Sequence, residues 1–212
     1  MEERESPVHP GPPAFIESQH WNAEAMRLFT AIDIPAAWLR AADAAAAELT
    51  RRAEPGLRMS APGNTHLTVR FLGEVEDDDV PALVAALAQL RATPCELRLS
   101  AAGTFGSAAR TRVVWLGVDG DQSCLDRLVG ALDTVLAEAG LEPDQSAWRP
   151  HLTLARVRDR TGAEERRALA ELVGTLPAPA GEPFVADCLA LYRSHRGSGP
   201  AHYELLTSVR FG

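Results

Sequence analysis

A segment that occurs twice in similar form constrains the fold of this chain more than any other feature of its sequence. HLTVRFLGE occupies residues 66–74 and HLTLARVRD occupies residues 151–159, so 85 positions separate the two copies. Shifting the 212-residue chain by the same 85 positions aligns further segments that have matching patterns. The sequence therefore predicts two halves built on a common plan.

Each half is predicted to run strand, helix, strand, helix, strand. Short apolar runs of strand-forming composition indicate strands at residues 27–34, 66–74, 96–100, 112–119, 151–159 and 184–192, with a last strand at 202–211. Apolar residues at helical spacing indicate helices at residues 35–54, 77–91, 120–139 and 161–173. We expect an α+β protein of two similar lobes, about residues 26–110 and 111–212, each β-α-β-α-β, with mainly antiparallel sheets around a central cleft.

The remaining composition bounds the class of protein. Residues 1–25 hold four prolines and several charges without periodicity, which predicts a disordered leader. No apolar run approaches the roughly 20 residues that span a membrane, and no secretory signal is recognisable. The cysteines, Cys95, Cys124 and Cys188, are odd in number and far apart, which excludes a disulfide scaffold and any CxxC motif. We expect a cytoplasmic monomer without contact to a membrane.

The charge of the chain limits its possible ligands. The formal net charge is −8, and all 21 cationic residues are arginine. A protein that grips a long nucleic acid along its backbone is normally basic, so a large non-specific footprint is excluded. A small anionic ligand in a local pocket remains compatible with this charge.

Two histidines and two threonines stand out in the repeated segment. Residues two apart in a strand share a face, so His66 lies with Thr68 and His151 with Thr153. The residues between them are expected to face a core: Leu67, Val69, Phe71, Leu152 and Leu154. If the lobes pack about a pseudo-two-fold axis, two imidazoles and two hydroxyls surround one point.

This group of side chains suits acid–base chemistry on a phosphate. A neutral imidazole accepts a proton near neutral pH and a charged one donates it. Threonine hydroxyls donate hydrogen bonds to phosphoryl oxygens. One histidine in a strand is more often just a partly exposed polar residue, but two at matching positions favour catalysis. Zinc sites use three or four protein ligands and no cysteine or carboxylate shares this face, so we expect no metal and no other cofactor.

The same segments carry a resemblance to a known family. HLTVRFLGEV, WRPHLTLAR, RLFTAIDIP, ARTRVVWLGV and LYRS, followed by Tyr203, Glu204 and Leu205, resemble the 2H phosphoesterase superfamily. More narrowly, the chain is similar to bacterial and archaeal RNA 2′,3′-cyclic phosphodiesterases, also called 2′-5′ RNA ligases. The resemblance runs from about residue 26 to residue 212.

The resemblance implies hydrolysis of an RNA 2′,3′-cyclic phosphate to a 2′-phosphomonoester. It implies that His66 donates the proton to the leaving 3′ oxygen and that His151 accepts one from water. Thr68 and Thr153 would hold the phosphoryl oxygens, and Arg156 would pair with the phosphate. The reverse reaction would join a cyclic phosphate to a 5′-hydroxyl through a 2′-5′ linkage.

The substrate contacts remain open at this point. Strict alternation turns Arg156 away from the His151 face unless the strand contains a bulge, whereas it turns Arg70 toward the site. Either arginine is therefore a candidate phosphate ligand. Phe29 and Tyr192 are candidates for stacking on a base, although aromatic residues in strands are usually core residues.

Two other functions remain open. The partners implied are RNA ends or nucleotides that carry a 2′,3′-cyclic phosphate, and the acidic net charge mildly favours a small substrate. A related enzyme on a small nucleotide cyclic phosphate or a 2′-5′ oligonucleotide is therefore one alternative. The other is a non-catalytic module that binds RNA ends, against which the two intact motifs argue.

Overall fold

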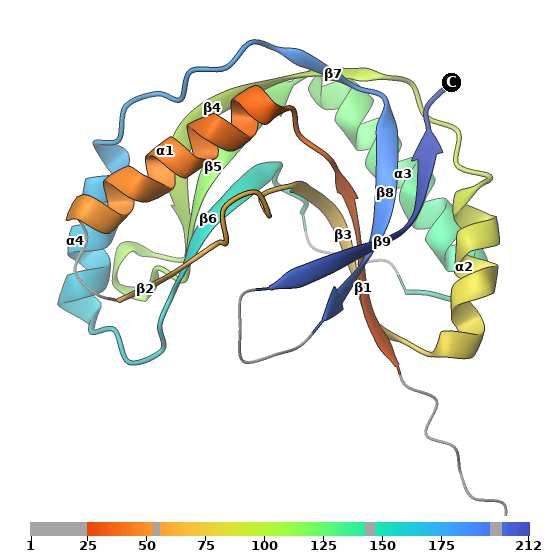
Figure 1. Ribbon diagram of the computed structural model, residues 1–212, viewed down its shortest axis with the longest axis horizontal. Coiled ribbons are helices and arrows are strands. Elements are labelled where there is room, and N and C mark those ends of the chain that lie inside the picture. Colours follow the sequence, from red (N-terminus) through yellow and green to blue (C-terminus); the bar gives the residue numbers. More distant parts are fainter. Residues whose placement is uncertain (1–24, 53–55, 143–146, 196–200) are drawn as a thin grey trace, which may run out of the picture.

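The computed structural model describes residues 25–52, 56–142, 147–195 and 201–212; residues 1–24, nearly all of the predicted leader, lie outside this description. The described strands form one arched sheet in the order β7-β4-β5-β6-β3-β1-β8-β9, and β2 also pairs with β6 (Figure 1). Their bounds are β1 (Met26–Ile32), β2 (Leu57–Met59), β3 (Leu67–Val75), β4 (Cys95–Phe105), β5 (Val113–Gly120), β6 (His151–Val157), β7 (Phe184–Ala186), β8 (Cys188–His195) and β9 (His202–Arg210). Every paired strand is antiparallel, as predicted.

The helices cover the outer side of the arch (Figure 1). They are α1 (Ala36–Arg52), α2 (Val80–Leu87), α3 (Gln122–Glu138) and α4 (Ala163–Gly174), with short 3-10 turns at Asp77–Asp79 and Ala108–Arg110. Helices α1 and α4 lie over one half of the sheet, while α2 and α3 pack together on the other half. The buried faces of α2, α3 and α4 carry mainly leucine and valine, and that of α1 carries Trp38, Ala42 and Leu49.

Strands are exchanged between the two halves of the sequence. Strand β4 pairs with β5 and not with β3, although it was expected in the first lobe. Strands β8 and β9, expected in the second lobe, extend the sheet beyond β1. A boundary near residue 110 therefore does not separate the two halves of the sheet, because each half takes strands from both parts of the chain.

The halves of the sheet meet where β3 pairs with β6. Leu67 is the register partner of Leu152, and both side chains are fully buried. Beyond this pair the strands diverge, so that β1 continues beside β3 and β5 beside β6. The two repeated segments are therefore neighbours at the middle of the sheet.

Both central strands contain a bulge at the same point of the repeated segment. In β6 the register with β5 shifts between Thr153 and Ala155, and Leu154 and Ala155 are both buried. In β3 the register with β1 shifts between Thr68 and Arg70, and here too two successive residues are buried. A bulge adds one residue to a strand and so reverses the facing of every residue after it.

The cysteine pattern misled the sequence analysis at one point. Cys95 and Cys124 form a disulfide, 29 positions apart in sequence. The pairing has a simple topological cause: β4 and β5 are antiparallel neighbours, and α3 begins directly after β5. The start of β4 therefore lies beside the start of α3.

Removing the disulfide should destabilise the fold. A cross-link that closes a loop of this length contributes about 3 kcal/mol to the free energy of unfolding. We expect Cys124→Ala, or reduction with dithiothreitol, to lower that free energy by about this amount in urea denaturation. Cys188→Ala is the matched control, because Cys188 is the free cysteine. Equal stability of the reduced and oxidised wild type would contradict the prediction.

Candidate active site

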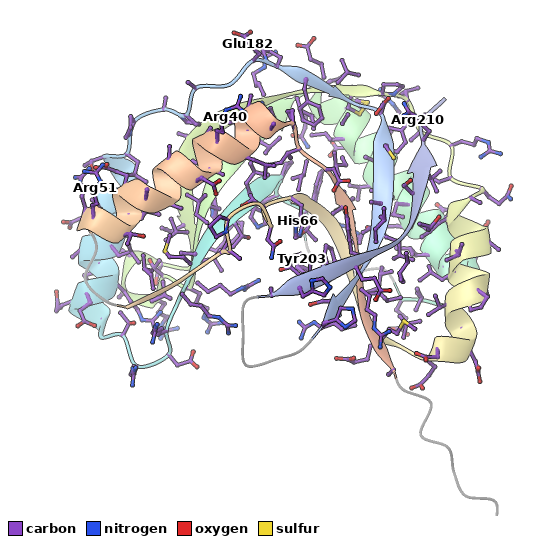
Figure 2. All side chains as sticks on the ribbon, viewed as in Figure 1. Arg40, Arg51, His66, Glu182, Tyr203 and Arg210 are labelled. Carbon is purple, nitrogen blue, oxygen red and sulfur yellow. A yellow bond between two sulfur atoms is a disulfide. The ribbon has the colours of Figure 1, made fainter. Side chains whose placement is uncertain are left out.

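The central strand pair gathers the four predicted catalytic residues. His66 and Thr68 flank Leu67, while His151 and Thr153 flank its partner Leu152. Antiparallel register then brings His66 next to Thr153 and Thr68 next to His151. All four side chains are half-buried, whereas the leucines between them are buried against the helices. His66 points into the hollow of the arch, beside Tyr203 (Figure 2).

The two histidines are held in the same way. The Nδ1 atom of His66 lies 3.0 Å from the carbonyl oxygen of Asn64, and Nδ1 of His151 lies 2.6 Å from that of Arg149. A carbonyl oxygen only accepts, so Nδ1 carries the hydrogen in both rings. The Nε2 atom of each ring is therefore left to exchange protons with a substrate.

The backbone of each threonine is also fixed by a side chain from elsewhere in the chain. Trp148 donates its indole N–H to the carbonyl oxygen of Thr68 at 2.9 Å, and Ser60 donates its hydroxyl to the carbonyl oxygen of Thr153 at 2.8 Å. Neither Trp148 nor Ser60 was expected at the site from the sequence. These bonds leave the threonine hydroxyls themselves available for a ligand.

Aromatic rings surround His66. Phe29 stacks on the imidazole at 4.8 Å between ring centroids, and Tyr203 meets it edge-on at 5.1 Å. Tyr192 stacks on Phe29 at 5.5 Å and donates its hydroxyl to the carboxylate of Asp33 at 2.7 Å. Burial and the Asp33 hydrogen bond raise the pKa of Tyr192, so the phenol stays protonated.

This arrangement decides the open question about Phe29 and Tyr192. Phe29 is buried and forms a wall behind the histidine, so it offers no free face to a base. Tyr192 is half-buried and held by Asp33. The sequence did not indicate that Tyr203 and Asp33 lie near His66, because only the packing of distant parts of the chain brings them there.

His151 lies beside a groove of about 330 Å³. Phe105 meets its ring edge-on at 4.7 Å, and Trp115 lies 6.4 Å away. Phe71, Phe105, Trp148 and Arg149 line the groove together with Thr68 and His151. Phe71, expected in the core, is 57% exposed because the bulge in β3 reverses its facing. Three aromatic side chains, those of Phe71, Phe105 and Trp148, thus line the groove beside His151.

The two bulges place the candidate arginines in different surroundings. After the bulge in β6, Arg156 returns to the face of His151 and Thr153 and is exposed. After the bulge in β3, Arg70 is turned to the opposite face, where it is 7% exposed. It forms a bidentate pair with Asp133 of α3 at 2.7 and 2.8 Å. The guanidinium of Arg70 therefore ties the sheet to a helix, although Arg70 also lines the groove beside Thr68 and His151. A contact of Arg70 with the phosphate stays a prediction.

The charges around the histidines are not symmetric. Burial lowers the pKa of both imidazoles below the ordinary value of 6.5. The carboxylate of Asp33 opposes this effect at His66, whereas the cation of Arg156 adds to it at His151. His66 thus has a carboxylate beside it that raises its pKa, although His151 lowers it, whereas the charged side chain that acts on His151 lowers its pKa.

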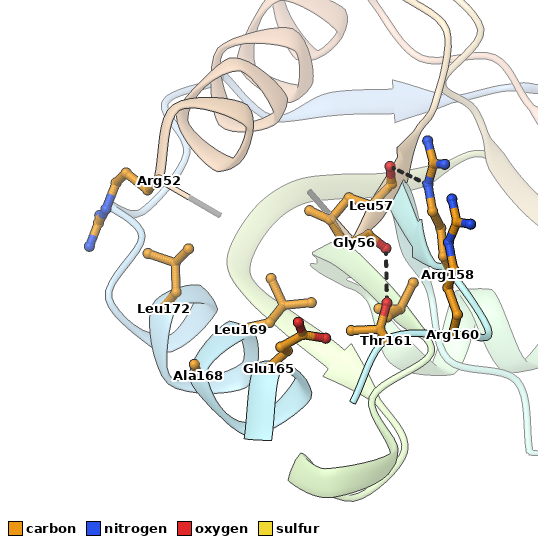
Figure 3. Close-up of a pocket in the computed structure, with 11 residues that line it drawn as sticks. Arg52, Gly56, Leu57, Arg158, Arg160, Thr161, Glu165, Ala168, Leu169 and Leu172 are labelled. Carbon is orange, nitrogen blue, oxygen red and sulfur yellow. Dashed lines mark hydrogen bonds between the residues drawn. The ribbon is translucent and has the colours of Figure 1, made fainter. Parts of the chain in front are cut away.

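A larger cavity lies away from these residues. It has a volume of about 480 Å³ and is lined mainly by α4, β2 and the end of β6 (Figure 3). Several of its polar groups have partners in the protein: Thr161 donates to the carbonyl oxygen of Gly56, and Glu165 accepts from the backbone N–H of Gly162 at 2.7 Å. The floor is apolar, with Leu57, Leu169 and Leu172. No histidine lines it, so the acid–base site is elsewhere.

The described ranges hold no group of three or more potential metal ligands and no helix that could span a membrane. An arched antiparallel sheet with two His-x-Thr motifs at its centre is the arrangement of the 2H phosphoesterase class. The sequence model of the 2′-5′ RNA ligase superfamily matches residues 36–198, and the chain belongs to this family.

Relatives and solved structures agree with this assignment. The chain is 30% identical to the RNA 2′,3′-cyclic phosphodiesterase of Methanocaldococcus jannaschii over 85% of its own length and 98% of that protein. It is 34% identical to the Aeropyrum pernix protein of the same name, over 52% of this chain and 61% of that protein. The crystal structure of Escherichia coli LigT with 3′-AMP matches 89% of this chain and 99% of that one, with a TM-score of 0.68 and 28% identity.

The lowered histidine pKa values should be visible in solution. We expect both imidazoles to titrate below pH 6.5 in NMR spectra. The folded protein disfavours the imidazolium form of both histidines. The unfolded chain therefore binds protons more readily, so the free energy of unfolding is highest above pH 6.5 and decreases as the pH falls through the folded-state pKa values. Urea denaturation at pH 7.5 and pH 5.5, compared between wild type and a His66→Gln, His151→Gln double variant, measures that loss. Titration of either imidazole above pH 6.5 would contradict the prediction.

Proposed function

We propose that this protein is an RNA 2′,3′-cyclic phosphodiesterase that uses its two histidines as general acid and general base, without a metal. The observation that carries the proposal is the pairing of the two His-x-Thr segments, which gathers two Nε2 atoms and two hydroxyls on one face. The names of the relatives in Methanocaldococcus jannaschii and Escherichia coli support the same substrate class.

The charges support a direction for proton transfer. Asp33 favours an imidazolium at His66, which makes His66 the general acid. Arg156 disfavours a proton on His151, which makes His151 the general base. This assignment agrees with the roles that the family resemblance implies.

The proposed reaction is an in-line displacement at phosphorus. His151 takes a proton from water through Nε2 as the oxygen attacks the phosphorus, and the bond from phosphorus to O3′ breaks. His66 gives its Nε2 proton to O3′, leaving a 2′-phosphomonoester and a 3′-hydroxyl. The hydroxyls of Thr68 and Thr153 and the guanidinium of Arg156 stabilise the charge on the phosphoryl oxygens. Proton exchange with solvent then resets the two imidazoles.

The same residues support the reverse reaction, in which a 5′-hydroxyl replaces water and a 2′-5′ linkage forms. A small nucleotide cyclic phosphate, or a 2′-5′ oligonucleotide, is the alternative substrate, and a substrate panel distinguishes these cases. Binding of RNA ends without turnover is the third possibility. The monomeric state and the cytoplasmic location stay predictions.

Loss of either imidazole should abolish most of the activity. General acid–base groups contribute about 10²- to 10⁴-fold to a rate. We expect His66→Ala and His151→Ala each to lower kcat on adenosine 2′,3′-cyclic phosphate by this factor. Wild-type turnover should be unchanged in EDTA, and chromatography should identify the 2′-phosphate. His195→Ala is the control, since His195 pairs with Glu204 on β8 and β9.

Three outcomes would count against the proposal. Inhibition by EDTA that added metal reverses would contradict the metal-free mechanism. A 3′-phosphate product would contradict the assignment of His66 as the acid for O3′. Binding of the cyclic phosphate without turnover by the wild type would favour the RNA-end binding module.

Asp33 should set the alkaline limb of the pH–rate profile. That limb reports the loss of the proton from His66, and the Asp33 carboxylate holds this proton more tightly. We expect Asp33→Asn to move the limb to lower pH by up to about one unit, while the acidic limb of His151 stays in place. Asp119→Asn, at an exposed carboxylate of β5, is the control. A shift of the acidic limb alone would show that the roles of the histidines are reversed.

A further inference from the structure

A second arginine lies next to Arg156. Arg58 of β2 is the direct register partner of Arg156 of β6. Both side chains are exposed, while Leu57 and Val157, the neighbouring partners, are turned toward the cavity behind the sheet (Figure 3). Directly opposed residues of antiparallel strands project on the same face. Arg58 therefore shares the face of Arg156, and so that of the catalytic threonines.

The pairing of these two arginines is unfavourable for folding. Like charges directly opposite each other on neighbouring strands destabilise a sheet. Neither guanidinium forms a hydrogen bond or an ion pair within residues 25–52, 56–142, 147–195 and 201–212. Other exposed arginines of the chain have acidic partners, such as Arg98 with Glu96 and Arg210 with Asp187. An anion that binds between Arg58 and Arg156 would relieve this repulsion.

The pair lies side by side at one end of the proposed reaction centre. Arg156 is three residues along β6 from Thr153, and because the bulge takes up one of them the strand advances by about two residues, or about 7 Å. Arg58 lies about 5 Å to the side of Arg156, on the edge of β6 that also carries β3. Two guanidiniums at this spacing can bind two neighbouring charges of one ligand.

We propose that Arg58 binds the phosphodiester that precedes the cyclic phosphate in an RNA strand, so that the enzyme selects oligonucleotide ends over mononucleotides. This inference rests on the proposed function. A nucleoside cyclic phosphate carries one phosphate and engages Arg156 alone. An oligonucleotide carries a second phosphate, and a guanidinium binds such a group through paired hydrogen bonds.

Binding of an RNA end by these two arginines is compatible with the net charge of −8. One or two phosphate contacts need only a few arginines, whereas binding along a long RNA backbone needs an extended basic surface. An aromatic groove also borders the catalytic pair, lined by Phe71 and Phe105 among other residues. Neither arginine lines this groove, so the backbone and the base of an RNA end have different residues to bind.

The test compares two substrates that differ by one nucleotide. Adenosine 2′,3′-cyclic phosphate and the dinucleotide ApA 2′,3′-cyclic phosphate are hydrolysed by wild type, Arg58→Gln and Arg58→Lys, and kcat/KM is measured for each. We expect Arg58→Gln to lower the ratio of kcat/KM for the dinucleotide over the mononucleotide about tenfold, as the loss of a charge-assisted contact does. Arg58→Lys, which keeps the charge, should restore part of it. Arg98→Gln on β4 is the matched control.

Two further readouts separate a phosphate contact from a structural effect. A dinucleotide with a neutral methylphosphonate linkage lacks the second charge. For this substrate, the ratio of kcat/KM to that for the mononucleotide should be the same in Arg58→Gln as in wild type. For the natural dinucleotide, the slope of log(kcat/KM) against log salt should fall by roughly 0.7 in the variant. The thermal midpoint of Arg58→Gln should equal or exceed that of wild type, because one of two opposed charges is gone.

The outcomes distinguish this inference from the proposed function. If the wild type hydrolyses both substrates and Arg58→Gln leaves their ratio unchanged, the contact with the second phosphate is overturned. Equal losses on both substrates would overturn it as well, because Arg58 would then act on the cyclic phosphate itself. Turnover of neither substrate by wild type would overturn the proposed function, on which this inference depends.

Discussion

The pairing of Leu67 with Leu152 is the contact on which the rest of the structure depends. It joins the two halves of the sheet and is the only register pair between β3 and β6 in the described ranges. Both leucines are fully buried, so water is excluded from the back of the site. The histidines and threonines on either side of the two leucines therefore point to the opposite face of the sheet. The same pair thus closes the core and brings the reactive side chains together.

A one-residue irregularity then determines which side chains reach the ligand. Each central strand carries a bulge just after its threonine, and each bulge reverses the facing of the residues beyond it. In β3 this buries Arg70 against Asp133 and exposes Phe71; in β6 it exposes Arg156. The two bulged strands therefore supply different chemistry from one local geometry, an aromatic ring at one end of the site and a guanidinium at the other.

The sequence predicted the elements and the central residues well, because both depend on local pattern. Apolar periodicity located the strands and helices, and the two His-x-Thr segments located His66 and His151. It failed where a residue depends on register or on distant packing. Alternation wrongly assigned Phe71 to the core because a bulge leaves no mark in the apolar pattern. Tyr203 reaches His66 only through the order of the strands, which also brings Cys95 to Cys124. The strand order does not follow the repeat in the sequence.

The two motifs are alike in backbone and unlike in surroundings, and this difference gives the reaction a direction. Two imidazoles with equal environments would share one proton equally, and neither would be committed to the role of acid. Aromatic rings lie against both imidazoles, but the Asp33 carboxylate acts on His66 and the Arg156 cation acts on His151. In the proposed mechanism the same cation binds the phosphate, so one group would stabilise the phosphoryl charge and disfavour a proton on the base. Binding of the anion and readiness of the base are thereby linked through a single guanidinium.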